Sequence, residues 1–152
     1  MKRLCIGALA LLLMLSGCER VGQPSANGAF YLRETTYGPR WAQAAFTPSS
    51  SDLDDQCMEV LAALQNPPDG LRAALPSGVR TLSLRVVGNV VYVDFSEEYA
   101  NLSAGNRSIA CAAVVHSLLQ LKGLFYISVT AVGEPQSPMY ERYCTMGTFM
   151  LE

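Results

Sequence analysis

One histidine and the serine after it are the residues of this chain best suited to nucleophilic catalysis. His116 is the only histidine among 152 residues, and Ser117 follows it in a stretch with helical character. Nucleophilic catalysis needs a base within hydrogen-bond reach of the nucleophile and a third group that orients the base. Consecutive residues of a helix point in different directions, so His116 cannot serve Ser117 in this way. We therefore expect a protein that is not an enzyme.

Carboxylates gather at Asp94, Glu97 and Glu98, at the end of a predicted strand. Glycosidases use two carboxylates held at a fixed separation. We prefer the other interpretation of this group, a turn-capping Asp94 followed by solvated loop acids.

A second acidic group, Asp52, Asp54 and Asp55, suggests calcium at first sight. A calcium-binding loop of the EF-hand type needs glycine at its sixth position and glutamate at its twelfth. Counted from Asp52, those positions hold Cys57 and Ala63. The sequence therefore predicts no metal site here, and nothing in it indicates a cofactor.

Five cysteines occur in the chain. Three of them, Cys57, Cys111 and Cys144, lie beyond the N-terminal region and form no C-x-x-C pair. An odd number permits one disulfide at most, with Cys57 and Cys111 as candidates. The alternative, which we prefer, is that all three are buried thiols that pack as small apolar side chains.

The N-terminus has the form of an export signal. Lys2 and Arg3 precede an apolar run over residues 4–15, too short for a membrane-spanning helix but suited to a signal-peptide core. The next residues, Leu15-Ser16-Gly17-Cys18, resemble the bacterial lipobox, in which the cysteine receives a diacylglyceryl group and becomes the first residue of the mature protein. This resemblance implies a lipoprotein signal peptide over 1–17 and lipidation of Cys18 with palmitate-type chains.

We then expect residues 18–28 to form a polar tether, and the lipid to anchor the protein to the extracytoplasmic face of the cell membrane. Without Lys2 and Arg3, the number of basic residues falls from 11 to 9 against 13 acidic residues. This acidic balance, with a pI near 5.4, argues against nucleic acid as a partner. The remaining length suits one domain, which we place at 29–152.

Hydrophobic periodicity predicts the elements of that domain. Strands are expected over 29–34 and 40–46, followed by a helix over 51–65 that Ser51 caps. A short helical turn is expected at 71–75. The helix predicted over 51–65 has one apolar face, which comprises Leu53, Cys57, Val60, Leu61 and Leu64.

The second half of the domain begins with a hairpin. Strands over 80–87 and 90–95 flank the two-residue turn Gly88-Asn89. A loop over 96–105 leads to a helix over 107–122 that is apolar nearly all round, capped by Asn106 and ended by Gly123. A strand over 124–132 and a closing strand over 145–151 complete the order. We predict a two-layer α+β domain with two helices on one face of a mixed sheet.

Residues 57–134 resemble the GerM domain of bacterial sporulation and spore-germination proteins. The resemblance rests on an ordered set of motifs. A leucine-proline-x-glycine turn is matched by Leu75-Pro76-Ser77-Gly78, and a Val-Asp-Leu-Ser segment with a nearby aromatic by Val93-Asp94-Phe95-Ser96 and Tyr99. An Asn-Thr-Leu segment with a later glycine is matched by His116-Ser117-Leu118 and Gly123, with His-Ser in place of Asn-Thr.

This resemblance implies a fold similar to the ring-building motifs of sporulation-channel proteins, and a binding or assembly role in the cell envelope. Asp94, Ser96, His116 and Ser117 are its motif residues, structural or binding. Asp94 and Ser96 bond backbone amides readily in turns, so we expect them to determine the fold first. Envelope proteins or a cell-wall polymer are the expected partners. The alternatives are a small-ligand-binding surface lipoprotein and an envelope hydrolase, and the chain lacks a catalytic set for the latter.

Overall fold

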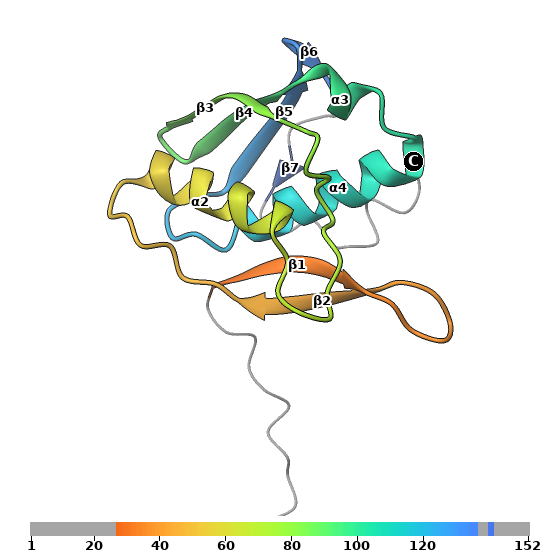
Figure 1. The fold of residues 1–152 in the computed structure, drawn as a ribbon. Helices are drawn as coiled ribbons and strands as arrows, with labels where there is room; N and C mark the ends of the chain where they lie inside the picture. The colour runs from red at the N-terminus through yellow and green to blue at the C-terminus, as the bar shows by residue number, and fades with distance from the viewer. Residues whose placement is uncertain (1–26, 137–139, 142–152) are drawn as a thin grey trace, which may run out of the picture.

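Two helices lie between a mixed β-sheet and a separate β-hairpin in the computed structural model, which describes residues 27–136 and 140–141 (Figure 1). The helices are α2 (Leu53–Gln65) and α4 (Ala104–Leu118), with a short α3 (Glu97–Ala100) before α4. The α+β class and the placement of two helices on one face of a mixed sheet are confirmed. The two N-terminal strands were predicted, but their position was not: they pair as a separate hairpin that adds a third layer to the two predicted.

The mixed sheet is built on three strands, β3 (Thr81–Val87), β4 (Val90–Phe95) and β5 (Tyr126–Ala131). The strands β3 and β4 are antiparallel around Gly88-Asn89, where Gly88 has a φ of 63° that glycine adopts without strain. The strands β4 and β5 are parallel, and the chain crosses between them through α3 and α4. Two short strands, β6 (Glu134–Pro135) and β7 (Tyr140–Glu141), both pair with β5.

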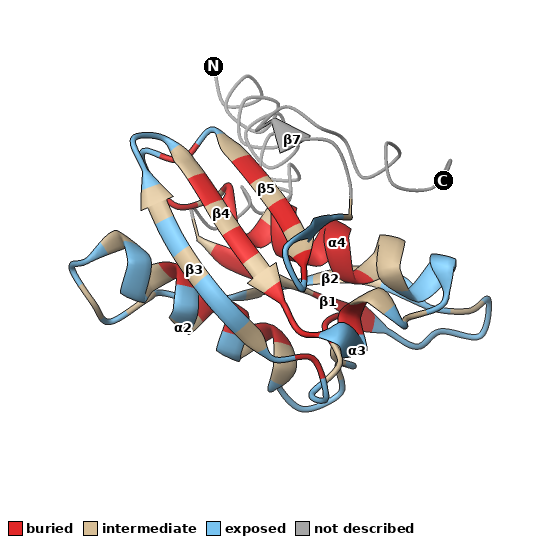
Figure 2. Ribbon diagram, turned by 90° about the horizontal axis from the view of Figure 1, so that it is seen from above, coloured by how far each residue is buried: buried red, intermediate tan, exposed pale blue. Residues whose placement is uncertain are grey.

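Alternation along β4 and β5 directs one set of side chains into the core. Buried and half-buried residues alternate along both strands in Figure 2, as expected for a sheet covered on one face. The buried set comprises Val91, Val93, Phe95, Ile127, Val129 and Ala131. The other face of the sheet carries the polar members of the alternation.

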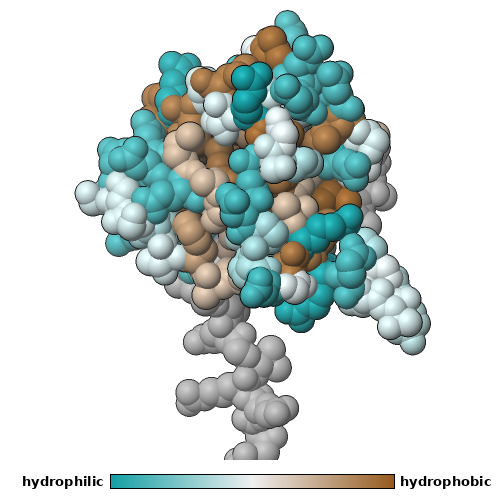
Figure 3. Space-filling model, in the orientation of Figure 1, coloured by the Kyte–Doolittle hydropathy of each residue, from teal (hydrophilic) through white to brown (hydrophobic). Residues whose placement is uncertain are grey.

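The helix α4 is buried on most of its circumference because it has a layer on each side. The mixed sheet covers one side, and the hairpin of β1 (Gly28–Arg33) and β2 (Arg40–Ala45) covers the other (Figure 1). This burial agrees with the sequence of the helix, which is apolar nearly all round. On the face seen in Figure 3, hydrophilic and hydrophobic residues are interspersed, as on an ordinary protein surface.

Both helices begin at residues other than those predicted. Asp52, not Ser51, caps α2, because Asp52 Oδ1 accepts the backbone N–H groups of Asp54 at 3.0 Å and Asp55 at 3.2 Å. Ser103, not Asn106, caps α4, because Ser103 Oγ accepts the N–H of Asn106 itself. The helix also ends at Leu118, earlier than predicted, and reaches Gly123 through a series of turns.

Two segments between the main elements also differ from the predictions. Residues 97–100 form α3 within the expected loop, and the first of its backbone bonds runs from Tyr99 N–H to Ser96 C=O. Residues 71–75 are not helical, because Arg72 exchanges two backbone hydrogen bonds with Leu32 of β1. The closing strand predicted over 145–151, the signal peptide and most of the tether lie outside the described residues.

Candidate functional site

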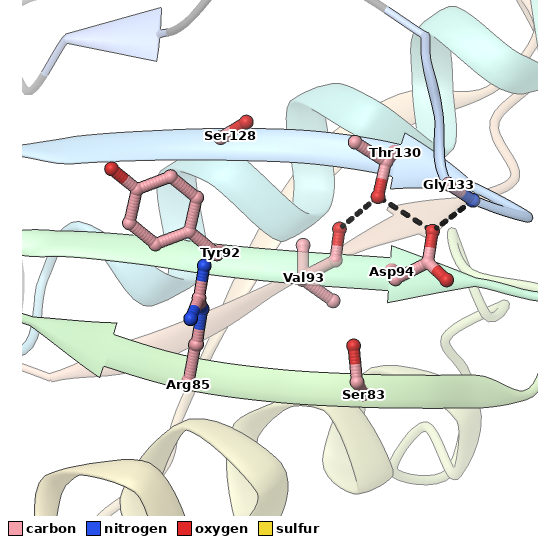
Figure 4. A pocket seen from close by; sticks show the side chains of 8 residues that line it. All are labelled: Ser83, Arg85, Tyr92, Val93, Asp94, Ser128, Thr130 and Gly133. Carbon is pink, nitrogen blue, oxygen red and sulfur yellow. Dashed lines mark hydrogen bonds between the residues drawn. The ribbon is translucent and has the colours of Figure 1, made fainter.

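The outer face of the mixed sheet, turned away from the helices, carries two rows of side chains that cross three strands. Strand register aligns Ser83, Asp94 and Thr130 in one row. The adjacent row consists of Arg85, Tyr92 and Ser128. These six residues, with Val93 and Gly133, line a depression of about 460 Å³ (Figure 4), which we call the outer-face site.

Asp94 is held in place at one end of the outer-face site. Its Oδ1 accepts a hydrogen bond from Thr130 Oγ1 at 2.5 Å and another from the Gly133 backbone N–H at 2.9 Å. Gly133 follows Val132, and both have positive φ in the turn after β5. The carboxylate therefore ties β4 to β5 and to that turn, while remaining on the wall of the depression.

Arg85 lies in the middle of the outer-face site with its guanidinium over the ring of Tyr92, 5.2 Å from the ring centre. A cation at this distance is attracted by the negative face of the ring. The two ion pairs within the described ranges, Arg72–Glu34 and Arg80–Glu98, do not involve Arg85. The guanidinium is thus oriented by an aromatic ring and keeps donors for another group.

Ser96, which follows Asp94 closely in the sequence motif, has a different position and role. It is buried, and its Oγ accepts the Arg80 N–H at 3.0 Å while its own N–H donates to Arg80 C=O at 2.9 Å. Hydrogen bonding from Ser96 is the main cause that lowers the pKa of the Glu98 carboxyl. Ser96 therefore closes the end of the β3–β4 hairpin and starts α3, away from the outer-face site.

The pair His116 and Ser117 lies on the other side of the sheet, where α4 meets the hairpin. Ser117 is buried, and its Oγ accepts the backbone N–H of Phe30 at 3.0 Å. The ring of Phe30 lies 5.8 Å from that of His116, and burial lowers the pKa of the His116 imidazole. The four motif residues are therefore not brought together: Asp94 lines the outer-face site, and the other three lie within the fold.

The described cysteines are both buried. Cys57 is a free thiol on α2, and burial, followed by the charges of Asp54 and Asp52, raises its pKa to about 12. No disulfide joins Cys57 to Cys111 of α4, so the disulfide alternative is not realised between them. A thiol with this pKa is protonated at neutral pH and therefore a poor nucleophile. Cys18 and Cys144 lie outside the described residues.

The acidic group at the start of α2 is engaged in the fold. Asp52 caps the helix, and Asp54 Oδ1 accepts the backbone N–H of Val86 at 2.7 Å, which covers part of the free edge of β3. In the described part of the chain, no three histidine, cysteine or carboxylate side chains come together as metal ligands would.

Sequence reasoning identified one member of the outer-face site, Asp94, and missed the others. Arg85, Tyr92, Ser128 and Thr130 are polar residues of β3, β4 and β5 that alternate with residues facing the core. The signal was present in the same alternation, since the residues between core positions share the opposite face. Which of them are neighbours depends on the pairing of three strands, which the alternation does not specify.

Comparison with known proteins identifies the domain. A family model described as Germane, for sporulation and spore germination, matches residues 26–137. No curated protein matches the chain.

Among solved structures, the tandem GerMN domains of the sporulation protein GerM from Bacillus subtilis align with a TM-score of 0.58 at 19% identity. The alignment covers 71% of this chain but only 39% of that one. The first GerMN domain alone aligns with a TM-score of 0.54 at 19% identity, over 72% of this chain and 84% of its own.

A Clostridium perfringens protein described as a candidate lipoprotein aligns with a TM-score of 0.52 at 14% identity, over 80% of this chain and 92% of its own. These likenesses establish a shared fold. Within the described residues, no helix is long and apolar enough to pass through a membrane.

Proposed function

The chain belongs to the Germane family of sporulation and spore germination, and from this we propose that it is a lipid-anchored, non-catalytic binding or assembly module of the bacterial cell envelope. The observation that carries the proposal is the position of the family match, residues 26–137, directly behind an N-terminus with the form of a lipoprotein signal. In this proposal Cys18 carries the lipid, and residues 18–28 hold the domain off the membrane.

The anchor has indirect support from a relative. The Clostridium perfringens protein that shares the fold is described as a candidate lipoprotein. Attachment by two or three acyl chains is stable without a membrane-spanning helix. The proposed location is the extracytoplasmic face of the cell membrane, where the domain meets envelope proteins and cell-wall polymer.

The non-catalytic character is supported by what the polar residues do. Ser117 Oγ and Ser96 Oγ each accept a backbone N–H, so both hydroxyl groups are engaged in the fold. The family concerned is one of sporulation and germination proteins. A domain of this kind acts by contact, with the outer-face site as the candidate surface.

A Cys18→Ala variant tests the anchor, with Cys5→Ala as the matched control because Cys5 lies inside the predicted signal peptide. Cells that express each form are grown with labelled palmitate and then fractionated. We expect the wild type and Cys5→Ala to carry label and to sediment with membranes, and Cys18→Ala to carry none. Label on the Cys18→Ala protein would contradict the anchor.

In-cell crosslinking of the wild-type protein, followed by identification of the captured species, tests the role. Envelope proteins or cell-wall polymer among the captured species support it. The second candidate function, capture of a free small ligand, is favoured by the depression at the outer-face site. Crosslinking that yields neither envelope protein nor polymer, together with a small molecule that copurifies, would favour that alternative.

A further inference from the structure

The outer-face site combines one guanidinium, one carboxylate and several hydroxyl groups on a sheet that is packed from behind by helices. Its side chains come from three paired strands, so their spacing is set by the backbone ladder and not by a mobile loop. A volume of about 460 Å³ is within the range of small-ligand sites. The lining offers apolar surface together with hydrogen-bonding groups, a combination that suits a ligand with both.

Arg85 indicates the charge of such a ligand. Its guanidinium is held against Tyr92 and takes part in neither ion pair of the described ranges. A guanidinium presents a planar set of donors that matches the two oxygens of a carboxylate. An anionic ligand group at this point would bind to donors that the fold already orients.

Asp94, Ser83 and Ser128 indicate the rest of the ligand. One oxygen of Asp94 is bonded to Thr130 and Gly133, and its other oxygen, drawn without a dashed line in Figure 4, is directed away from both. A carboxylate oxygen accepts from hydroxyl groups, and a serine hydroxyl both donates and accepts. Such partners suit the alternating donors and acceptors of a sugar.

We propose that the outer-face site binds a carboxylate-bearing carbohydrate, as N-acetylmuramic acid provides in a cell-wall glycan where its lactyl group carries no stem peptide. Arg85 binds the carboxylate, and Asp94 with the serines binds ring hydroxyls. This inference rests on the proposed function, because only an envelope location brings the domain to such a glycan. The fractionation of Cys18→Ala tests the location alone, so the two can fail separately.

The test compares two disaccharide probes, which differ by one lactyl ether group, on the full-length protein in detergent. The first is the disaccharide of N-acetylglucosamine and N-acetylmuramic acid, which has a carboxylate. The second is N,N′-diacetylchitobiose, which has none. We expect the first probe to bind at least about tenfold more tightly, as the loss of a charged hydrogen bond implies.

Arg85→Gln should reduce affinity for the first probe about tenfold and leave the second unchanged. Arg40→Gln is the matched control, since it removes the same charge from an exposed position on β2, in the hairpin layer. We expect it to bind both probes as the wild type does. Far-UV circular dichroism checks that both variants are folded.

Three results would overturn the proposal. The first is that the wild type binds both probes equally. The second is that Arg85→Gln and Arg40→Gln have equal affinity for the first probe. The third is that an oligoglutamate peptide binds more tightly than the first probe through Arg85. The last result would make an acidic polypeptide the partner. The comparison of probes on the wild type needs no variant, so it stands even if Arg85→Gln folds poorly.

Discussion

Ser117 Oγ, on α4, accepts the backbone N–H of Phe30, on β1, at 3.0 Å, although 87 positions separate the two residues. The serine is buried, and the N–H it satisfies belongs to the layer that covers the helix. Ser117 therefore serves to attach the N-terminal hairpin to the domain, although from the sequence alone it resembles a nucleophile beside a histidine.

Ser117→Ala should destabilise the protein by about 1–3 kcal/mol, because the Phe30 N–H loses its partner in a half-buried position. The free energy of unfolding is measured by urea titration. Ser77→Ala is the matched control, since Ser77 is exposed in a turn and should change stability little. Equal effects of the two substitutions would contradict the role assigned to Ser117.

The stability should decrease as the pH falls below about 6.5, in part through His116. Burial lowers the pKa of this imidazole in the folded protein, whereas in the unfolded chain it takes a proton near pH 6.5. Below pH 6.5 the unfolded state therefore binds more protons than the folded state. The contribution of His116 to stability is fully present above pH 6.5 and is lost as the pH falls below it. His116→Gln should lose less stability than the wild type between pH 7 and pH 5. Parallel curves for the two proteins would refute this assignment.

Cys57 should cause a loss of stability at high pH. Its pKa is raised from 9.0 to about 12, so between these values the unfolded chain loses a thiol proton that the folded protein keeps. Stability therefore falls as the pH rises above 9, by up to about 1.4 kcal/mol per pH unit. Urea unfolding under reducing conditions at pH 8 and pH 10 should show a smaller loss for Cys57→Ala. Iodoacetamide should label Cys57 only after unfolding, and rapid labelling of the native protein would contradict its burial.

Val132→Asn should stabilise the protein by about 0.5–1 kcal/mol. Val132 has a φ of 53°, which a β-branched side chain adopts with strain, and asparagine tolerates it. The substitution would also place asparagine directly before Gly133, and Asn-Gly is the pair preferred in tight hairpin turns. Val87→Asn is the control, because Val87 is 55% exposed and Val132 58%, but Val87 is extended in β3. Thermal unfolding should show opposite shifts for the two variants, and a lower melting temperature for Val132→Asn would contradict the strain.

Local patterns were sufficient to predict most elements. The buried positions Val91, Val93 and Phe95 follow the period of two, and Cys57 and Leu64 lie on the predicted face of α2. These predictions succeeded because burial on one face imposes a period on the sequence itself. The predicted starts of the two helices were wrong because more than one nearby residue could act as the cap, and the choice depends on which side-chain oxygen reaches the free amides.

The outer-face site could be predicted only in part. Asp94 was identified through a sequence motif, but its partners Thr130 and Gly133 are more than 35 positions away. Arg85 and Tyr92 were not predicted as site residues, because each is an ordinary polar residue of an amphipathic strand. Their chemistry arises from being neighbours, and the register of strand pairing decides that.

The sequence by itself determined the α+β class, the apolar faces of the elements and the family resemblance, because each is written in local periodicity and motif order. Only the tertiary structure decided that the N-terminal hairpin forms a third layer, that Ser117 and Ser96 bind backbone amides, and that Arg85 and Asp94 share one depression. The reason is physical. Layer order and strand register come from contacts between residues far apart in the chain, and these contacts leave no period in the sequence.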